Sequence, residues 1–192
     1  MKAPRGFSLV ELVIGMVILA VLLSIAVPAF SNWLRNARVR TAAESVQNGL
    51  QLARAEAVRR NNAVRFSLVT TTDDACAPAV AGPSWVVSMD DPAGKCATPA
   101  SDTVDPRIIQ SRNGAEGSSA TTIAAGQSTF VFNSLGRVTP TPAGNVAIDI
   151  SSPTAACMAT GPVRCLRVVV SIGGQIRMCD PALPSGDAQG SC

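Results

Sequence analysis

Residues 6–34 read GFSLVELVIGMVILAVLLSIAVPAFSNWL, and this stretch decides the fold. From Leu12 to Leu34 it holds twenty-three residues without a charge, and a helix needs about 20 apolar residues to cross a bilayer. A secretory signal has a shorter apolar region followed by a small-residue cleavage site, whereas the small residue Gly6 precedes the run here. We therefore expect cleavage to remove residues 1–6 and to leave residues 7–34 on the protein as a transmembrane helix.

Glu11 is the one acidic residue near the start of this apolar segment. A carboxylate is costly at the membrane centre and less so near a helix end. One interpretation is an end residue whose side chain reaches back to water. The other is a carboxylate held for a positive partner, such as the α-amine that cleavage creates on Phe7. If that amine belongs to a neighbouring subunit, the pair sets the register between subunits.

The remainder of the chain has the composition of a small β-rich domain with many loops. The 192 residues include 4% aromatics, 15 Gly, 13 Pro and no Tyr. The protein also has no His, which removes the commonest general base and the commonest metal ligand. We find no nucleophile–base pair and no metal cluster in the sequence, and so expect no catalytic residues, no metal, no cofactor and no enzymatic activity.

Six cysteines follow the apolar segment, and none forms a Cys-x-x-Cys pair. Because zinc sites use such spacing or His, disulfides in an oxidising compartment are the better interpretation. This places the C-terminal part of the chain in the periplasm, a question that the flanking charges Lys2, Arg5 and Arg35 leave open. The cysteines are Cys76, Cys96, Cys157, Cys165, Cys179 and Cys192.

Residues 35–62 continue the helical pattern as an amphipathic stem. Apolar residues recur at three- and four-residue spacing, which predicts a buried helix face, and Asn61-Asn62 ends the pattern. The predicted helix therefore runs from Leu9 to Arg60. Arginines on its other faces are either solvated or contact neighbouring subunits or lipid headgroups. The recurring apolar residues are Val39, Ala42, Val46, Leu50, Ala53 and Ala57.

Residues 63–192 change to short β-branched runs separated by Gly, Pro, Asp and Ser, a pattern typical of strands and loops. Cys76 and Cys96 bracket the second run and are positioned to close a loop there. The predicted strands are Ala63–Thr70, Ser84–Met89, Arg107–Gln110, Ser128–Asn133, Asn145–Ser151, Val163–Ser171 and Gly174–Cys179.

The segment Gly6–Leu12, GFSLVEL, resembles the type IV prepilin leader motif. The resemblance implies that a prepilin peptidase cuts between Gly6 and Phe7 and methylates the new amine of Phe7. It also implies that Glu11 is the acidic residue that such subunits use in assembly and register. Pro28 lies where pilins have a helix-kinking proline.

Two later segments resemble the GspH/FimT-like group: LARAEAVRRN at residues 52–61 and FNSLGRV at residues 132–138. The resemblance implies an α+β pilin fold, in which a long N-terminal transmembrane helix continues into an antiparallel β-sheet head. It implies a minor pilin that primes a type IV pilus and is a candidate for DNA uptake. The alternative is a minor pseudopilin of type II secretion.

The implied location is the bacterial inner membrane, crossed once, with the head in the periplasm and later in a pilus or pseudopilus. The implied partners are other major and minor pilins or pseudopilins, the prepilin peptidase, inner-membrane lipid and, as a candidate, double-stranded DNA. DNA contacts in the FimT-like branch are attributed to a C-terminal Gly-Arg-x-Arg. This chain has Gly174-Gln175-Ile176-Arg177, so Gln175 replaces the first arginine, and Arg167 is the candidate to compensate. Arginines that are merely solvated on an exposed hairpin are the alternative.

Two turns are compatible with this C-terminal hairpin. A three-residue loop at residues 171–173 would place Cys165 opposite Cys179 and the two arginines opposite each other, where like charges want an anion. A two-residue turn at residues 173–174 would put the cysteines on opposite faces and separate the arginines. The disulfide pairing that we expect is Cys76–Cys96, Cys165–Cys179 and Cys157–Cys192.

Overall fold

The computed structural model describes residues 8–116, 120–184, 186 and 190–192. Within these residues there is one helix, α1, which spans Leu9–Arg60, the bounds that the sequence predicts. The chain divides into two units, Met1–Leu34 and Arg35–Cys192. The first holds the apolar part of α1, and the second holds the rest of α1 and the strands.

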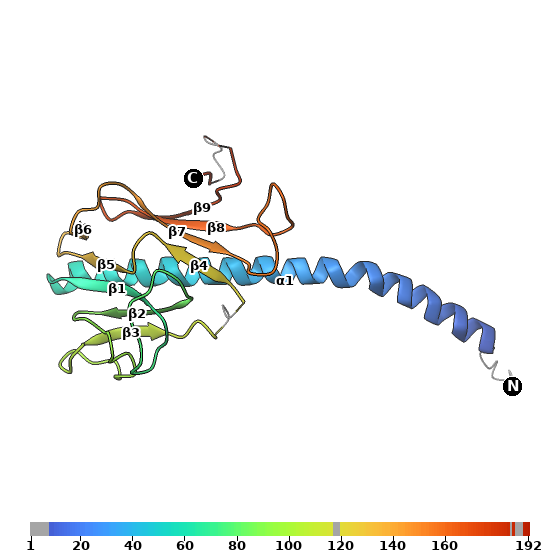
Figure 1. Ribbon diagram of the computed structural model, residues 1–192, viewed down its shortest axis with the longest axis horizontal. Helices are drawn as coiled ribbons and strands as arrows, with labels where there is room; N and C mark the ends of the chain where they lie inside the picture. The colour runs from blue at the N-terminus through green and yellow to red at the C-terminus, as the bar shows by residue number, and fades with distance from the viewer. Residues whose placement is uncertain (1–7, 117–119, 185, 187–189) are drawn as a thin grey trace, which may run out of the picture. The chain divides into compact units, whose positions relative to one another are not determined.

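In the described part of the chain, nine strands follow α1 and form two sheets, in which all pairs of neighbouring strands are antiparallel (Figure 1). The first sheet has the order β3-β2-β1-β5-β6 and the second has the order β4-β7-β8-β9. The expected α+β fold with an antiparallel head is therefore confirmed. The strands are β1 Val64–Val69, β2 Ser84–Ser88, β3 Ile108–Arg112, β4 Thr122–Ala125, β5 Thr129–Phe132, β6 Val138–Thr139, β7 Val146–Ser151, β8 Leu166–Val170 and β9 Ile176–Cys179.

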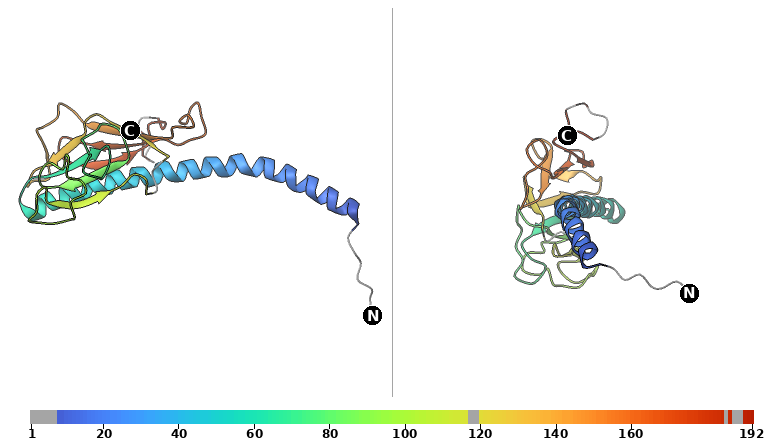
Figure 2. Two further views of the ribbon diagram at one scale, coloured as in Figure 1. Left: turned by 60° about the horizontal axis from the view of Figure 1, so that its bottom comes forward. Right: turned by 90° about the vertical axis from the view of Figure 1, so that its right-hand side faces the viewer.

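The core of the second unit lies between α1 and both sheets. All six apolar stem positions expected from the helical spacing are buried, together with Ala43 and Gly49. They pack with Phe66 and Phe130 of the first sheet and with residues such as Val168 of the second. Figure 1 shows the second sheet above the helix and strands β2 and β3 below it, and Figure 2 shows both sheets beside this part of α1 in two further views.

A second, smaller apolar cluster comprises Val69, Val86 and Ile108 together with Cys76 and Cys96. Side chains alternate between the two faces of a strand, so Leu68 contributes to the main core and its neighbour Val69 to this cluster. The connections between β1, β2 and β3 thus pack on the face of the first sheet that is turned away from α1.

Of the nine strands in the residues that the structure describes, the sequence predicts seven and misses β4 and β6. Strand β6 has only two residues, Val138 and Thr139, and is too short to show the alternation of apolar and polar residues that marks a strand. Strand β4 has four residues, of which Ile123 alone is buried. Short strands of this kind are held by their neighbours, β7 and β5, more than by their own sequence.

Candidate functional site

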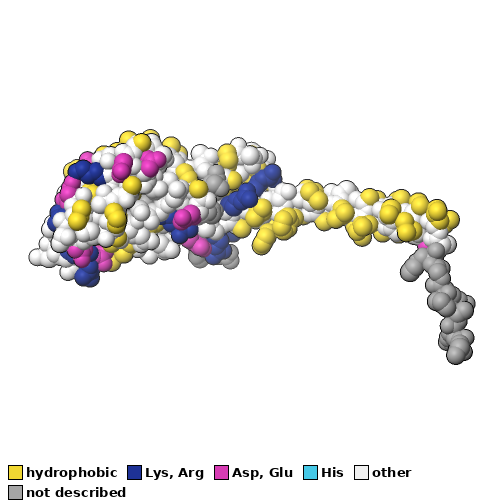
Figure 3. Space-filling model, turned by 90° about the horizontal axis from the view of Figure 1, so that it is seen from below, with side chains coloured by type: hydrophobic (Ala, Val, Ile, Leu, Met, Phe, Trp, Pro, Cys, Tyr) yellow, Lys and Arg dark blue, Asp and Glu magenta, His cyan; other side chains and the backbone are white. Residues whose placement is uncertain are grey.

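The apolar segment of α1 exposes its side chains. Its large side chains from Leu9 to Trp33 are all at least half exposed. Figure 3 shows these hydrophobic side chains along the helix. Among the described residues, α1 is the one helix long and apolar enough to cross a membrane. An apolar surface of this size needs lipid or the apolar surface of other subunits.

Ser8 and Glu11 form a reciprocal pair at the start of α1. The Ser8 amide donates to Glu11 Oε2 at 2.9 Å, and the Glu11 amide donates to Ser8 Oγ at 3.2 Å. This is a capping box, which satisfies two amides that lack partners within the helix. The Ser-x-x-Glu spacing at residues 8–11 is the signal that our sequence reasoning overlooked. Glu11 is therefore an exposed carboxylate engaged in a local contact on the first turn.

The predicted processing residues lie next to this cap. Gly6 and Phe7 fall outside the described residues, so cleavage and N-methylation stay predictions. Pro28 lies inside α1, which continues past it although proline has no amide to donate. The hydroxyls of Ser24 and Ser31 donate to the carbonyls of Val21 and Val27 nearby. A kink at Pro28 also stays a prediction.

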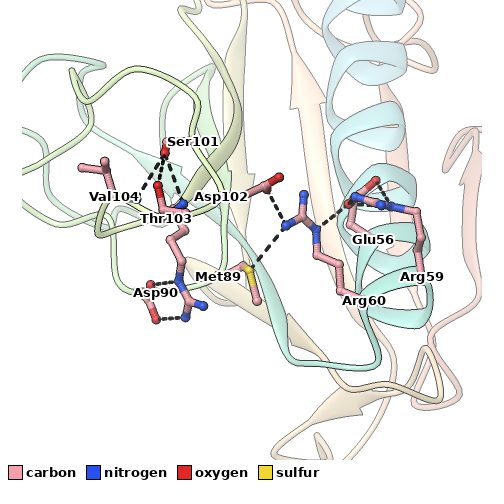
Figure 4. A network of polar contacts seen from close by, with 10 residues as sticks. Glu56, Arg59, Arg60, Met89, Asp90, Ser101, Asp102, Thr103 and Val104 are labelled. Atoms are coloured by element: carbon pink, nitrogen blue, oxygen red, sulfur yellow. Dashed lines mark hydrogen bonds and ion pairs between the residues drawn. The ribbon is translucent and has the colours of Figure 1, made fainter.

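At its other end, α1 is joined to the head by an ion-pair network (Figure 4). Arg60 bridges Glu56 at 2.7 Å and Asp102 at 2.5 Å, and Arg59 contacts Glu56 at 2.6 Å. The hydrogen bond from Arg59 lowers the pKa of Glu56 below its ordinary value. The network ties the last turn of the helix to the connection between β2 and β3.

The neighbouring pair Asp90–Arg107 holds the same connection. Arg107 donates from Nε and Nη2 to the two carboxylate oxygens of Asp90, at 2.6 and 2.7 Å. The two-point contact fixes the guanidinium in the plane of the carboxylate. These hydrogen bonds lower the pKa of Asp90. The connection between β2 and β3 is thus held at both ends by the Asp90–Arg107 pair and in between by the Cys76–Cys96 disulfide.

The two segments that resemble the GspH/FimT-like group contact each other. Arg54, in residues 52–61, donates from Nε to the carbonyl of Gly136, in residues 132–138, at 3.2 Å. Asn133 shapes the second segment, because its side-chain oxygen accepts from the amides of Leu135 and Arg137. The sequence alone does not indicate that these segments meet.

All six cysteines are in disulfides, and the first pair is the one expected, Cys76–Cys96. The other two expected pairs, Cys165–Cys179 and Cys157–Cys192, are wrong. The structure joins Cys157 to Cys165 and Cys179 to Cys192. The wrong pairs came from an incorrect hairpin register. Cys157 lies beside Val163 through a bridge, which brings it to Cys165, and Asp180 pairs with Ser191, which brings Cys192 to Cys179.

Neither expected register of the C-terminal hairpin is correct. Val170 pairs with Ile176, and Ser171 and Gln175 close a three-residue loop at residues 172–174. Gly174, the last loop residue, has φ +79°, the left-handed conformation that glycine adopts most readily at this place in a three-residue hairpin. The loop therefore sits one residue later than the three-residue alternative.

This register puts Arg167 and Arg177 on the same face of the second sheet but not opposite each other. Arg167 pairs with Cys179, and Arg177 pairs with Val169. Arg167 instead faces Asp149 on β7 and donates to its carboxylate at 2.6 Å. Arg177 is exposed and lies 3.4 Å from the Cys192 carbonyl, and Gln175 is exposed on the loop. Asp149, which sequence reasoning did not consider, therefore neutralises one of the two candidate arginines.

No group of His, Cys, Asp or Glu suited to a metal ion is present in the part of the chain that the structure describes. Among known families, residues 42–174 match the one described as type II transport protein GspH, and residues 1–27 match the prokaryotic N-terminal methylation motif. The chain belongs to the GspH family. Comparison with curated proteins gave no match.

This GspH-family chain is similar in fold to the type IV minor pilin FimU of Pseudomonas aeruginosa. One crystal structure of FimU is 18% identical, with a TM-score of 0.50, over 80% of this chain and 98% of the crystallised chain. A second crystal form is 19% identical, with a TM-score of 0.51, over 80% and 94%. The chain thus combines the GspH family, an N-terminal methylation motif and a pilin fold. Its family and fold are those of structural pilins, which indicates assembly with other pilins and processing by a prepilin peptidase.

Proposed function

We propose that this protein is a minor pilin that helps to prime a type IV pilus. Residues 7–34 anchor it in the bacterial inner membrane, and residues 63–192 form a periplasmic head on the stem of residues 35–62. The observation that carries this proposal is the exposed apolar segment of α1 with one carboxylate, Glu11, on its first turn. The three disulfides support an oxidising location for the head.

In the proposed mechanism, a prepilin peptidase cleaves between Gly6 and Phe7 and methylates Phe7. The assembly machinery then extracts the subunit, and apolar stems replace lipid around the helix. Glu11 exchanges its local partner, the Ser8 amide, for the positive amine of Phe7 on a neighbouring subunit. The capping box supports this step, because it keeps the carboxylate exposed at the helix start at little cost until the charged partner arrives.

A minor pseudopilin of type II secretion is the second candidate, favoured by the family description of residues 42–174. The likeness to FimU and the disulfide-rich head favour the pilus. A clean deletion strain separates the two. We expect it to lose sheared surface pili, to recover them on complementation and to secrete its exoproteins normally. Unchanged pili with blocked secretion would replace our proposal by the pseudopilin.

DNA uptake is a finer role that we propose for the hairpin, with double-stranded DNA as partner. Arg177 is the better-placed residue, because Asp149 already pairs with Arg167. In a mobility shift with the full chain, we expect Arg177→Ala to weaken binding and Arg167→Ala to leave it nearly unchanged. The logarithm of the binding constant should fall linearly with the logarithm of the salt concentration, with a slope of about −0.9 per phosphate neutralised. Unchanged binding in the Arg167→Ala/Arg177→Ala double variant would sink the role.

A further inference from the structure

One loop of the head is fastened to the first turns of the stem. Asn36 donates from Nδ2 to the Pro162 carbonyl at 3.4 Å and accepts from the Arg164 amide at 2.7 Å. The Cys157–Cys165 disulfide closes this loop, and the Met158 amide donates to the Val163 carbonyl at 2.7 Å. All these contacts lie within the unit Arg35–Cys192. The loop is thus held at the turn of α1 that contains Asn36.

That turn comes directly after the charge-free run, which ends at Leu34. An α-helix rises 1.5 Å per residue, so Arg38 and Arg40 lie about 6 and 9 Å along the axis from Leu34. The headgroup layer on each side of a bilayer is about 5–7 Å thick. When residues 7–34 span a membrane, the helix brings Arg38 to the level of the headgroups and Arg40 to just beyond their outer edge, from where its long side chain can reach back to them.

Three arginines and one methionine form what we call the collar: Arg38, Arg40, Arg164 and Met158. Arg38 is exposed and has no hydrogen bond or ion pair with any residue the structure describes. Among the residues that the structure describes, Arg40 pairs with Glu44, one turn along the helix, at 2.8 Å with both side chains exposed. Such an exposed pair contributes little to stability and yields readily to a better partner.

The remaining collar residues belong to the loop that Asn36 holds at this turn. Arg164 contacts Asp180 and is still 53% exposed, while the Asp180 side chain is almost fully buried. Met158 is 49% exposed. The only exposed acid among these contacts is therefore Glu44. The collar combines guanidinium groups, which bind phosphate with two parallel hydrogen bonds, and an apolar side chain that can enter the acyl boundary.

We propose that the collar binds anionic phospholipid headgroups, such as phosphatidylglycerol, in the periplasmic leaflet. This inference rests on the proposed membrane anchor and adds a specific lipid contact to it. Each Lys or Arg next to a membrane helix strengthens binding of the protein to an anionic membrane surface by about fivefold. The contact holds the head against the membrane before extraction and is lost in the fibre, where lipid is absent.

The methionines allow this to be tested in the full chain. The protein is labelled with ¹³C-methyl methionine and placed in nanodiscs of phosphatidylcholine alone or with phosphatidylglycerol, each with a trace of headgroup-spin-labelled lipid. Met158 reports on the collar, and Met89, in the first sheet's half of the head, is an internal control. We expect phosphatidylglycerol to broaden the Met158 methyl signal several-fold more than the Met89 signal. High salt should reverse the effect.

Matched variants and a second lipid label distinguish the possible outcomes. Arg38→Gln/Arg40→Gln should abolish the lipid dependence at Met158, whereas Arg59→Gln/Arg137→Gln, which removes the same charge elsewhere, should keep it. A lipid label deep in the acyl chains should broaden Met16, and its failure to do so would refute the anchor itself. Broadening of Met16 with no lipid dependence at Met158, or an equal loss in both double variants, would overturn the collar while leaving the anchor intact.

Discussion

Gly174 is the position where a single methyl group should do most damage to the head. It ends the loop between β8 and β9 with φ +79°. A Cβ at this position would lie 1.9 Å from the carbonyl oxygen of Gly136 and 3.3 Å from the Cα of Arg137. Both neighbours are backbone atoms, so no side chain can rotate away. Gly174→Ala therefore has to push the C-terminal hairpin away from the turn at residues 132–138.

The expected cost has two parts. A non-glycine residue in the left-handed region costs about 1–2 kcal/mol. Inserting a methyl group into a closely packed contact costs about 1–3 kcal/mol. We expect a total of about 2–5 kcal/mol, part of which is weakening of the Arg54–Gly136 hydrogen bond. For a unit of this size, each kcal/mol shifts the melting temperature by about 2–4 °C, so the loss should be at least about 4 °C.

Gly173→Ala is the matched control, because the same methyl group on the adjacent residue would meet nothing closer than Ser171 Oγ at 3.9 Å. Thermal unfolding of the full chain in detergent, followed by circular dichroism, compares the two variants with the parent protein. We expect Gly173→Ala to melt within about 2 °C of the parent, as surface substitutions usually change stability by less than 0.5 kcal/mol. Equal melting temperatures for the two variants would refute the close approach of the two turns.

Three other predictions follow from contacts described above. Glu11→Ala should leave processing intact, as seen by the size of the mature band, and lower incorporation into sheared pili; normal incorporation would refute the pairing role. The lowered pKa of Glu56 means that its ion pairs stabilise the head above the unfolded pKa of about 4.3 and are lost as the pH falls through the folded value. Denaturant titrations of Glu56→Gln should therefore show a smaller loss of stability on acidification than the parent protein, and parallel curves would contradict this. Replacing Cys76 and Cys96 together by Ala opens a loop with a sequence separation of 20 and should cost about 3 kcal/mol in the same titrations at neutral pH, whereas an unchanged midpoint would be unexpected.

Much of the fold is predictable because its signals are local. The spacing of Val39, Val46 and Leu50 identifies the buried face of the stem, and the structure buries all three. A helix repeats every 3.6 residues whatever it packs against, so the pattern survives without knowledge of the partner. The capping box of Ser8 and Glu11 is equally local and was within reach of sequence reasoning.

The candidate site was less predictable, because its contacts join residues that are distant in sequence. From the sequence, Arg167 is a candidate to bind an anion. Only the register of β7 and β8 places Asp149 opposite it. The Cys157–Cys165 pair depends on a bridge between Cys157 and Val163. In both cases the local sequence is equally compatible with another strand register or another cysteine pairing.

By itself, the sequence determined the apolar segment, the extent of α1, its buried stripe, seven strands and the resemblance to the GspH family, since each depends on composition, period or motif within a short window. Only the tertiary structure decided the division into two sheets, the strands β4 and β6, the hairpin register and two of the three disulfides. Those features follow from which strands lie side by side, and a shift of one residue in a turn changes every partner along the strand.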